Sequence, residues 1–193
     1  MGKSLLEKAG RKEVLDPNRL LVILAQKGDE HATYKLYTLY AKAMLNTAYR
    51  IVNNKEDAED ILQESFIKAF AKLNSFSFES TFGAWLKRIV VNHSINHINR
   101  KKELHFFDTA PEPKEHTVDI IHAEQVKQRI ELLYASLHQL PDGYRTVFSL
   151  FVLEGYDHKE IAQILNISVS TSISQLSRAK QKLRTLINTS IHE

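Results

Sequence analysis

Residues Asp157–Arg184 read DHKEIAQILNISVSTSISQLSRAKQKLR, and this stretch decides the fold. Asp157 can cap a short helix, and Glu160 follows three residues later in an arrangement close to a capping box. Asn166 stands at the break between two apolar patterns, where a sharp turn often needs the left-handed backbone that Asn tolerates. Ser168 can cap the helix that follows. The pattern predicts two helices joined by a tight turn, as in a helix-turn-helix.

These helices are expected over residues 158–165 and 169–188, and the second has two different faces. Helical spacing predicts an inward face of Val169, Ser172, Leu176, Ala179 and Leu183. The opposite face carries short hydrogen-bond donors and an arginine, which reach phosphates and base edges when a helix lies in the major groove. Together with Ser168 at the helix start, this outer face comprises Ser170, Thr171, Ser174, Ser177, Arg178 and Gln181.

The charge of this region distinguishes two interpretations of the pattern. A helical hairpin whose polar residues merely face water would show the same turn. From Ile161 to His192, however, there are four Lys or Arg and no Asp or Glu. A solvated face normally mixes both signs, whereas a face that approaches phosphates excludes carboxylates. We therefore predict that this part of the chain binds DNA.

The composition is that of an ordinary globular protein, with 193 residues, 43% hydrophobic residues, 25% charged residues and a formal net charge of +3. The absence of cysteine excludes disulfides, thiol catalysis and thiolate metal sites. The longest clean apolar run, Leu20–Ala25, is far shorter than the roughly 20 residues of a membrane span, and the N-terminus lacks a signal-peptide core. We expect a cytoplasmic protein without a membrane span.

Upstream of the helix-turn-helix the periodicity is also helical, and no alternating pattern indicates a strand. A first helix should begin at Asp16-Pro17 and end at Gly28, and a second should cover 31–52. A third helix should end near Leu73. A fourth should be capped by Ser80 or Thr81 and end near Arg100, and later helices should cover 120–138 and 142–154. The inward face expected for the second helix is Leu36, Leu39, Ala43, Thr47 and Ile51.

Residues 103–119 read ELHFFDTAPEPKEHTVD, with two prolines, five acids and no helical stripe, which is typical of a linker. We therefore expect an all-α protein of two small helical domains, residues 17–102 and 120–190, joined by this acidic linker. The first 16 residues form an N-terminal extension to which we assign no role.

The third helix is acidic on one side, since residues 55–64 carry five acids and one base. Its buried stripe should contain Ala58, Ile61, Leu62, Phe66, Ala69, Phe70 and Leu73. Asp57, Asp60 and Glu64 lie opposite, with Ile67 and Ala71 among them. An apolar centre surrounded by charge is typical of a protein interface, although composition alone favours a solvated face.

A cluster of aromatic residues precedes a basic segment. Phe76, Phe78, Phe82 and Trp85 lie within ten residues, and Ser80–Lys102 contains five Lys or Arg and no acid. Aromatic faces can accept unpaired bases, at about 1 to 3 kcal/mol each, which offsets the stacking lost when DNA strands separate. Phe82 and Trp85 share a helical face with apolar neighbours, so both could instead be core residues, the role we expect for Trp85.

Three further stretches carry a family resemblance: NKEDAEDILQESFIKAFAKLNSF, FGAWLKRIVVNHSINHINRKK and LPDGYRTVFSLFVLEGYDHKEIAQILNIS. In this order and spacing, and with the second helix of the helix-turn-helix, they resemble an extracytoplasmic-function (ECF) sigma factor, the compact two-domain branch of the bacterial sigma-70 family. The resemblance covers roughly residues 20–187. It implies a transcription initiation factor whose region 2 domain docks on RNA polymerase and melts the minus-ten element, and whose region 4 domain reads the minus-35 element.

The resemblance also implies roles for individual residues. The acidic helix should bind the clamp helices of the polymerase's largest subunit through Asp57, Asp60, Gln63, Glu64 and Ile67. The loop from Asn74 to Ser80 should capture a flipped base, with Phe76, Phe78 and Phe82 lining its pocket. Phosphates and upstream duplex should be held by Lys87, Arg88, Asn92, Asn96, Arg100 and Lys101. The family further implies contact with the polymerase flap, a linker near the RNA exit path and an anti-sigma factor.

The recognition helix departs from the family pattern at two positions. Ile173 and Gln175 stand where many relatives carry Lys or Arg at one or both sites. The loss of such contacts should weaken phosphate binding and flatten its salt dependence. Ile173 could touch a thymine methyl group or simply widen the core stripe.

Other functions fit the residues less well. A stand-alone helix-turn-helix transcription regulator would have no use for an acidic docking helix and a strand-melting loop. A polymerase-binding protein that sequesters the enzyme would lack the promoter-reading half. His93 and His97 could share a metal, but no carboxylate lies within the neighbouring turns. We expect neither an enzyme nor a cofactor, since no phosphate-binding glycine loop or nucleophile set is present.

Overall fold

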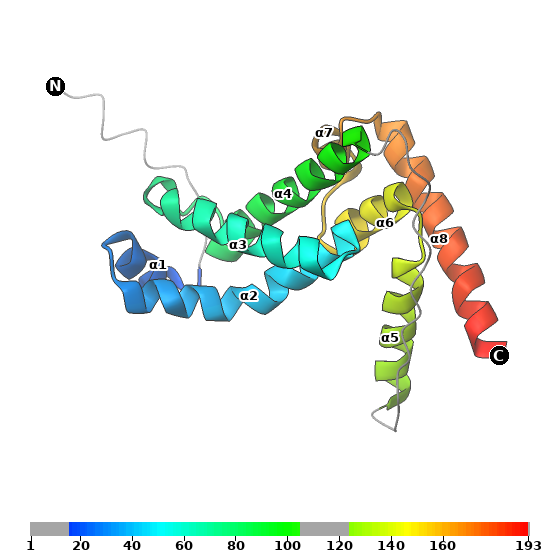
Figure 1. Ribbon diagram of the computed structural model, residues 1–193, viewed down its shortest axis with the longest axis horizontal. Coiled ribbons are helices and arrows are strands. Elements are labelled where there is room, and N and C mark those ends of the chain that lie inside the picture. The colour runs from blue at the N-terminus through cyan, green and yellow to red at the C-terminus, as the bar shows by residue number, and fades with distance from the viewer. Residues whose placement is uncertain (1–15, 105–123, 193) are drawn as a thin grey trace. The chain divides into compact units, whose positions relative to one another are not determined.

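The computed structural model describes residues 16–104 and 124–192 (Figure 1). The N-terminal extension up to residue 15 and the predicted linker, except its first two residues, lie outside the described residues. The first described part contains α1 (Arg19–Gln26), α2 (Glu30–Val52), α3 (Lys55–Ala71), the 3₁₀ turn η1 (Leu73–Ser75) and α4 (Phe82–Leu104). The second contains α5 (Glu124–His138), α6 (Asp142–Phe148), the π-helical turn η2 (Ser149–Leu153), α7 (His158–Leu165) and α8 (Val169–His192).

The described residues contain no strand, and the prediction of an all-α protein is confirmed. They form two compact units. Among the described residues, the first contains 16–48 and Glu56–His93, and the second contains Tyr49–Lys55, 94–104 and 124–192. The domain boundary that we expect in residues 103–119 stays a prediction, because most of that segment is not described.

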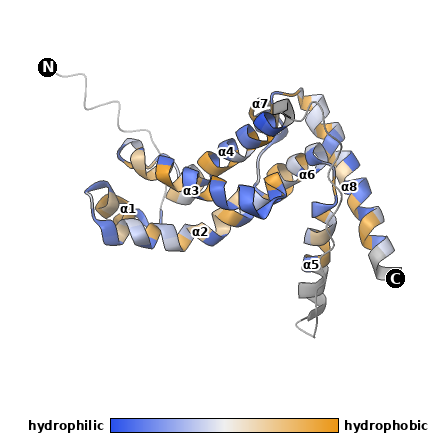
Figure 2. Cartoon of the chain, viewed as in Figure 1, coloured by the Kyte–Doolittle hydropathy of each residue, from blue (hydrophilic) through white to orange (hydrophobic). Residues whose placement is uncertain are grey.

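The first unit has a core built from one face of each of its helices, and Figure 2 shows apolar and polar residues on different sides of these helices. Fully or almost fully buried side chains come from every helix of the unit and include Val22, Leu36, Ile61, Phe66, Phe82, Leu86 and Val90. Burial of such apolar surface is the main favourable term in folding, at about 25 cal/mol per Å².

The predicted inward face of α2 is partly wrong. Leu39 is 55% exposed and Ala43 is exposed as well. The buried face instead runs through Ala32, Leu36, Met44, Thr47, Ala48 and Ile51. At 3.6 residues per turn, residues 36 and 47 lie three turns apart on one line, whereas the three-residue step from 36 to 39 turns away from that line. The spacing of apolar residues at intervals of three or four therefore did not locate the centre of the buried face of α2.

A buried carboxylate, that of Asp16, joins the starts of two helices. Its exposed fraction is 7%, and its Oδ1 accepts a hydrogen bond from Asn18 N at 2.8 Å, at the N-terminus of α1. Its Oδ2 accepts from Phe82 N at 2.6 Å, at the N-terminus of α4. Thr81 Oγ1 also accepts from Ala84 N at 3.2 Å, so one of the two predicted caps of the fourth helix is confirmed. The first turn of α4 is therefore capped by the neighbouring Thr81 and by Asp16, which lies just before α1.

Tyr40 of α2 packs at the same junction. Its ring lies 5.3 Å from the Phe82 ring, between centroids, and Asn18 Nδ2 donates to its hydroxyl at 2.9 Å. Burial raises the pKa of the Tyr40 hydroxyl, and the nearby Asp16 adds to this effect, while the Asn18 hydrogen bond opposes it. A Cβ atom on Gly83 would lie 2.7 Å from Tyr40 Cε1, so a glycine here lets α4 begin close to α2.

In the second unit, α8 packs against α5, α6 and α7. Buried residues of this unit include Leu137, Leu140, Val147, Leu150, Ile161, Leu176, Ala179 and Leu183. The predicted helix over 142–154 is divided into α6 and η2, where Glu154 N donates to Ser149 O, five residues earlier, at 3.0 Å.

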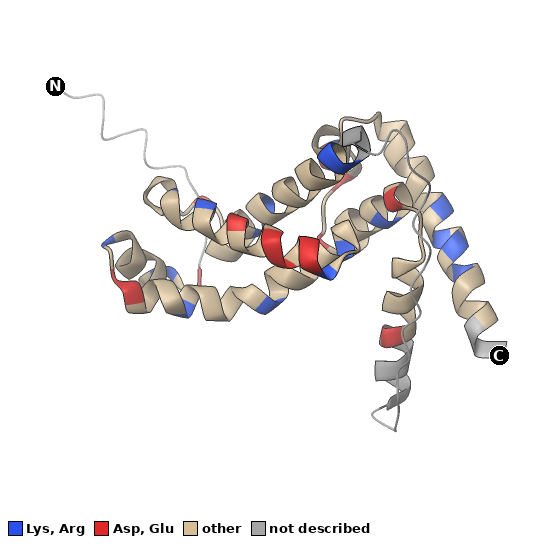
Figure 3. Ribbon diagram, in the orientation of Figure 1, with Lys and Arg blue, Asp and Glu red and all other residues tan. Residues whose placement is uncertain are grey.

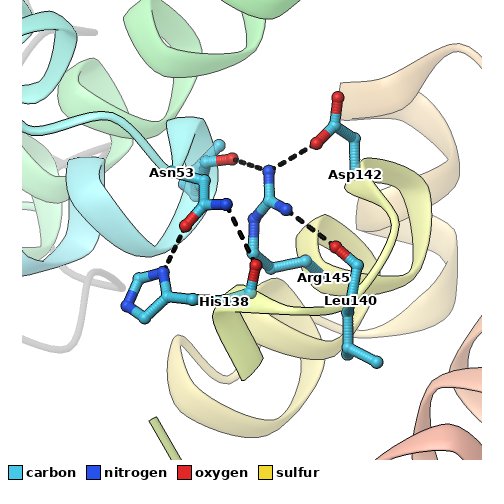
Figure 4. A network of polar contacts seen from close by, with 6 residues as sticks. Asn53, His138, Leu140, Asp142 and Arg145 are labelled. Atoms are coloured by element: carbon cyan, nitrogen blue, oxygen red, sulfur yellow. Dashed lines mark hydrogen bonds and ion pairs between the residues drawn. The ribbon is translucent and has the colours of Figure 1, made fainter. Parts of the chain in front are cut away.

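A buried arginine organises the polar contacts of the second unit (Figure 4). Arg145 is 2% exposed, and a buried arginine needs hydrogen-bond partners to offset its desolvation. Its guanidinium donates to Leu140 O at 2.9 Å, to Asp142 Oδ1 at 2.6 Å and to Ile51 O at 3.4 Å. Beside it, Asn53 Nδ2 donates to His138 O at 3.0 Å, and the Asn53 amide oxygen also contacts His138 Nδ1. The segment Tyr49–Lys55 is thereby tied to α5 and α6.

The double role of Asp16 yields a prediction for stability. Asp16→Ala should lower the free energy of unfolding of the first unit by about 1–3 kcal/mol, because it removes two hydrogen bonds and leaves the buried Phe82 N–H without an acceptor. Urea unfolding followed by the fluorescence of Trp85, the only tryptophan, would measure the change.

Asp29→Ala is the matched control. Asp29 is an exposed cap whose Oδ1 accepts only one backbone N–H, that of Ala32 at 2.9 Å. Its loss should lower the free energy of unfolding by about 1 kcal/mol. Equal effects of the two substitutions would contradict the double-cap interpretation.

Candidate functional site

The helix-turn-helix is built as the sequence predicts. Asp157 Oδ1 accepts from Glu160 N at 2.8 Å, and Glu160 Oε2 accepts from Asp157 N at 2.8 Å, so the capping box is complete. Asn166 has the expected left-handed backbone, with φ 52° and ψ 49°. Ser168 Oγ accepts from Thr171 N at 3.0 Å and caps α8. These local contacts fix the angle at which α8 leaves α7.

The structure separates the two faces of α8 almost as expected. Four residues of the predicted inward face are buried, namely Ser172, Leu176, Ala179 and Leu183. Val169 is 40% exposed, which corrects its assignment, because the first residue of α8 lies beyond the helices that pack on this face. The predicted outer face is exposed at Ser170, Ser174, Ser177, Arg178 and Gln181 and half-buried at Thr171, and Ser168 before it is exposed.

The two departures from the family pattern on α8 have different surroundings. Ile173 is 51% exposed, so it does not widen the core stripe and its side chain is available for a contact. Gln175 is half-buried, and its Oε1 would lie 3.4 Å from a Cβ atom on Gly143, so this side chain packs beside α6. A Lys or Arg side chain at position 175 would therefore extend from the side of α8 that faces α6.

Three cations on α8 were missing from the predicted DNA-binding residues. Lys180, Lys182 and Arg184 are all exposed, and Figure 3 shows Lys and Arg gathered along the middle of this helix. Their signal was present in the sequence as part of the acid-free run. The first turns of a recognition helix reach base edges, and later turns can still approach phosphates.

On α3 the predicted division into a buried and an exposed face is confirmed. Ala58, Ile61, Leu62, Phe66 and Ala69 are buried, as is Leu73 after the helix, while Phe70 is half-buried. On the other side Asp60, Gln63, Glu64 and Ala71 are exposed, Asp57 is half-buried, and Ile67 is 71% exposed. Figure 3 shows the acidic residues gathered on the N-terminal part of α3. Ile67 is thus a large, exposed apolar side chain on the same side of α3 as the carboxylates.

Two exposed tyrosines of α2 are absent from the predicted interface residues. Tyr34 is 65% exposed and Tyr37 is 37% exposed. The Tyr37 ring contacts the Phe66 ring of α3, with 4.8 Å between centroids. The signal in the sequence was their spacing, because the two tyrosines are three residues apart and lie on a side of α2 other than its buried face.

The aromatic rings of the loop between α3 and α4 differ in exposure. Phe76 and Phe82 are 5% and 0% exposed, so the structure places both in the core and not on an open platform for bases. They form a cluster with the half-buried Trp85, at centroid distances of 5.2 Å and 5.8 Å. Phe78 is half-buried, lies 4.9 Å from Phe76 and has a φ of +59°. Phe78 is therefore the predicted ring that reaches solvent, near the exposed Asn74.

The predicted phosphate-binding residues form a line on α4. Arg88, Asn92, Asn96 and Arg100 are all exposed and follow one another at intervals of four residues. Residues four apart lie above one another on a helix, so these side chains share a face. Lys101 is exposed as well, and Lys87 is half-buried. This face carries only positive charges and amides.

The structure brings no metal-binding group together at the two histidines of α4. His93 Nδ1 lies 3.1 Å from Ser65 Oγ, and its Nε2 lies 3.1 Å from Lys68 Nζ. Within residues 16–104 and 124–192 no three His, Asp or Glu side chains are placed to hold an ion. Among the described helices, none is long and apolar enough to cross a membrane.

Comparison with known proteins places these surfaces in a family. The family model described as "Sigma-70 region 2" matches residues 36–103, and that described as "Sigma-70, region 4" matches residues 130–183. The alternative of a stand-alone regulator loses its support, because such a protein would lack region 2.

Two curated relatives extend the similarity over most of the chain. The ECF RNA polymerase sigma factor SigW of Bacillus subtilis is 32% identical over 169 residues, which are 82% of this chain and 90% of that protein. The RNA polymerase sigma-H factor of Pseudomonas aeruginosa is 31% identical over 178 residues, covering 87% of this chain and 92% of that protein.

Two solved structures share the fold. CnrH, in complex with the cytosolic domain of CnrY, aligns with a TM-score of 0.53 and 24% identity over 90% of this chain and 99% of that one. The sigma factor RpoE of Bartonella quintana, in complex with the anti-sigma factor NepR, aligns with a TM-score of 0.57 and 22% identity over 80% and 96%. From the family models and the curated relatives, the chain belongs to the ECF sigma factors of the sigma-70 family, transcription initiation factors that direct RNA polymerase to promoters.

Proposed function

We propose that this sigma factor uses three separate surfaces: the exposed face of α3 for core RNA polymerase, the Phe78 loop with α4 for the minus-ten element, and the outer face of α8 for the minus-35 element. The observation that carries the proposal is the separation of charge. The exposed side of α3 carries acids and an exposed isoleucine, whereas the exposed faces of α4 and α8 contain cations and amides. Phosphates attract the second kind of face and repel the first.

The α3 face supports a protein partner. A buried interface centre is usually depleted of charge and rich in large apolar side chains, and the rim is polar. Ile67 supplies such a centre, while Asp60, Gln63 and Glu64 supply the rim. The clamp helices of the polymerase's largest subunit would then present basic residues, which would speed association by electrostatic attraction. Asp57 is half-buried and would lie at the edge of this contact.

The loop after α3 supports the capture of a base. Opening DNA costs about 1.4 kcal/mol per base-pair step, and stacking of a base on an aromatic ring returns about 1–3 kcal/mol. Phe78 has an accessible ring, and Asn74 can form hydrogen bonds to a base edge. Phe76 and Phe82 contribute from the core, since their rings support the loop from behind. Arg88, Asn92, Asn96 and Arg100 would follow the adjacent phosphates along α4.

The outer face of α8 supports recognition in the major groove. Its N-terminal turns carry Ser170, Thr171 and Ser174, which can donate to phosphates or base edges. Ile173 is exposed beside them and would contact a thymine methyl group. Arg178 can reach a guanine or a phosphate, and the exposed cations that follow it would contact the backbone.

The solved neighbours suggest how such a factor is controlled. RpoE of Bartonella quintana was solved in complex with the anti-sigma factor NepR. We extend this kind of partner to the present chain as a proposal. We also propose that the second unit docks on the polymerase flap. The protein would act in the cytoplasm, where the polymerase operates.

The α3 assignment predicts a loss of polymerase binding on charge reversal. Asp60→Lys and Glu64→Lys should each weaken the affinity for core RNA polymerase at least tenfold, because like charges would face each other across the interface. Titration of labelled protein with core enzyme would measure the dissociation constants. Glu59→Lys is the comparison, since Glu59 is exposed at the flank of that face, about 100° around α3 from Asp60, and it should weaken binding less than either substitution. Three equal affinities would refute the docking assignment.

The loop assignment predicts a defect in promoter opening. Phe78→Ala should leave the closed complex of the holoenzyme intact and slow opening about tenfold, because a stacking partner of the unpaired base is lost. Permanganate reactivity of thymines over time would report the rate. Phe78→Tyr should behave like the parent, whereas Phe78→Leu, which keeps apolar volume without an aromatic face, should resemble Phe78→Ala. Unchanged opening in all three variants would remove the base-capturing role.

The α8 assignment predicts a change in salt dependence. If Arg178 contacts a phosphate, Arg178→Ala should reduce the slope of log affinity against log salt by about one. Promoter binding by the holoenzyme over a series of salt concentrations would give the slope. Lys42→Ala removes an exposed charge from α2, outside the helix-turn-helix, and should leave the slope as it is. A slope that changes equally in both variants would argue against a specific contact.

A further inference from the structure

The loop that carries Phe78 is held at three points, two of them from α1 and one from Asp16, which lies just before α1. Gln26 Nε2 donates to Leu73 O at 2.9 Å and to Phe76 O at 3.1 Å. The Arg19 guanidinium carbon lies 4.5 Å from the centre of the Phe78 ring, a cation–π contact. Asp16 accepts the hydrogen bond of Phe82 N, where the loop ends. Gln26 thus holds the chain before Phe78, Arg19 contacts the ring, and Asp16 holds the chain after it.

Phe78 itself has an unusual backbone. Its φ of +59° lies in the left-handed region, which a bulky residue without a turn requirement rarely adopts. Such a conformation persists only where the surrounding structure fixes it, and it is often found at binding sites. Gln26 of α1 and Asp16 just before α1 supply that surrounding structure, because they fix the carbonyl two residues before Phe78 and the amide four residues after it.

The position of α1 in the chain makes these contacts informative. The region 2 family model begins at residue 36, whereas α1 covers Arg19–Gln26. The helix is short, and Val22 and Ala25 are its buried side chains. Its polar residues Arg19 and Gln26 do not only face water, since both reach the loop. A helix needed for core packing alone would have no reason to use two long polar side chains in this way.

We propose that α1 is a positioning element for promoter opening, and that Arg19 is the residue that holds the Phe78 ring in the orientation that receives the unpaired base. Gln26 and Asp16 keep the two ends of the loop in place, and Arg19 selects the ring position between them. This inference rests on the proposed base-capturing role of Phe78. It adds that the role is pre-organised before DNA arrives, so that less ordering is needed when the base binds.

Two other roles for Arg19 make different predictions. A direct contact between Arg19 and a DNA phosphate would act independently of the Phe78 ring. A purely structural role would lower the stability of the first unit and the amount of holoenzyme formed. The positioning role instead requires that Arg19 act through Phe78 and leave polymerase binding unchanged.

The test is a double-mutant cycle in full-length holoenzyme with Arg19→Ala, Phe78→Ala and the double variant. The measurement is the rate of promoter opening from permanganate reactivity, together with the affinity for core enzyme and the thermal midpoint of the free protein. We expect Arg19→Ala to slow opening about three- to tenfold in the parent and by less than twofold in the Phe78→Ala background. Arg19→Lys should recover part of the rate, because it keeps a cation near the ring.

Two further variants keep the test decisive. Arg19→Met keeps the apolar stem and removes the charge, so it should slow opening like Arg19→Ala even if the alanine variant is poorly folded. Lys27→Ala removes an exposed cation just after α1 and should open promoters at the parental rate.

Each remaining outcome overturns the proposal in a recognisable way. An equal slowing by Arg19→Ala with and without Phe78 would indicate a direct DNA contact. A parental rate for Arg19→Ala and Arg19→Met, combined with slow opening by Phe78→Ala, would leave the loop function standing and remove the role of α1. A parental rate for Phe78→Ala would remove the base-capturing role itself, and the inference with it. A matching loss of stability and polymerase binding would reduce Arg19 to a structural residue.

Discussion

The first unit depends on the hydrogen bond that Phe82 N donates to the buried Asp16 carboxylate. This single contact joins the start of α1 to the start of α4, and so it sets where the loop between α3 and α4 must end. The close approach of Tyr40 to Gly83 at the same junction leaves little freedom in the direction of α4. The exposed line from Arg88 to Arg100 and the ring of Phe78 both take their positions from this joint. A buried carboxylate is suited to this task, because its two oxygens can accept from two backbone amides at once.

The second unit uses a different device for the same purpose. Arg145 is buried, and its guanidinium collects a carboxylate and two backbone carbonyls, one of which belongs to the segment Tyr49–Lys55. Arginine is suited here because its planar fork donates in several fixed directions. Glu154 and Arg50 add an ion pair at 2.5 Å in which both side chains are largely shielded from water. The capping box and the left-handed Asn166 then orient α8 by local contacts alone. Local contacts thus set the direction of the recognition face, and buried charged side chains stabilise the unit that carries it.

Much of this architecture could be predicted because its causes are local. The limits of α7, the capping box, the turn at Asn166 and the cap at Ser168 each need only a few neighbouring residues. The division of α3 into a buried and an exposed side also follows from spacing, since its apolar residues form one dense stripe. On α2 the same reasoning misplaced Leu39 and Ala43, because alanines and tyrosines occur all around that helix and only the packing partners decide which side is covered. The widened turn after Phe148 likewise follows from how α6 must fit its neighbours.

The helices, their local caps, the family and the segregation of acids from bases can be predicted from the amino acids alone, because each of these depends on residue type and on spacing within a turn or two. Which aromatic ring of the loop can meet a base depends instead on how the helices pack. Phe76, Phe78 and Phe82 are chemically identical, and they differ only in whether α1, α2 and α4 close over them. The same holds for Arg19 and Gln26, whose polar ends reach a loop some fifty residues away in the chain. Contacts over such distances arise from packing, and no local pattern of residues records them.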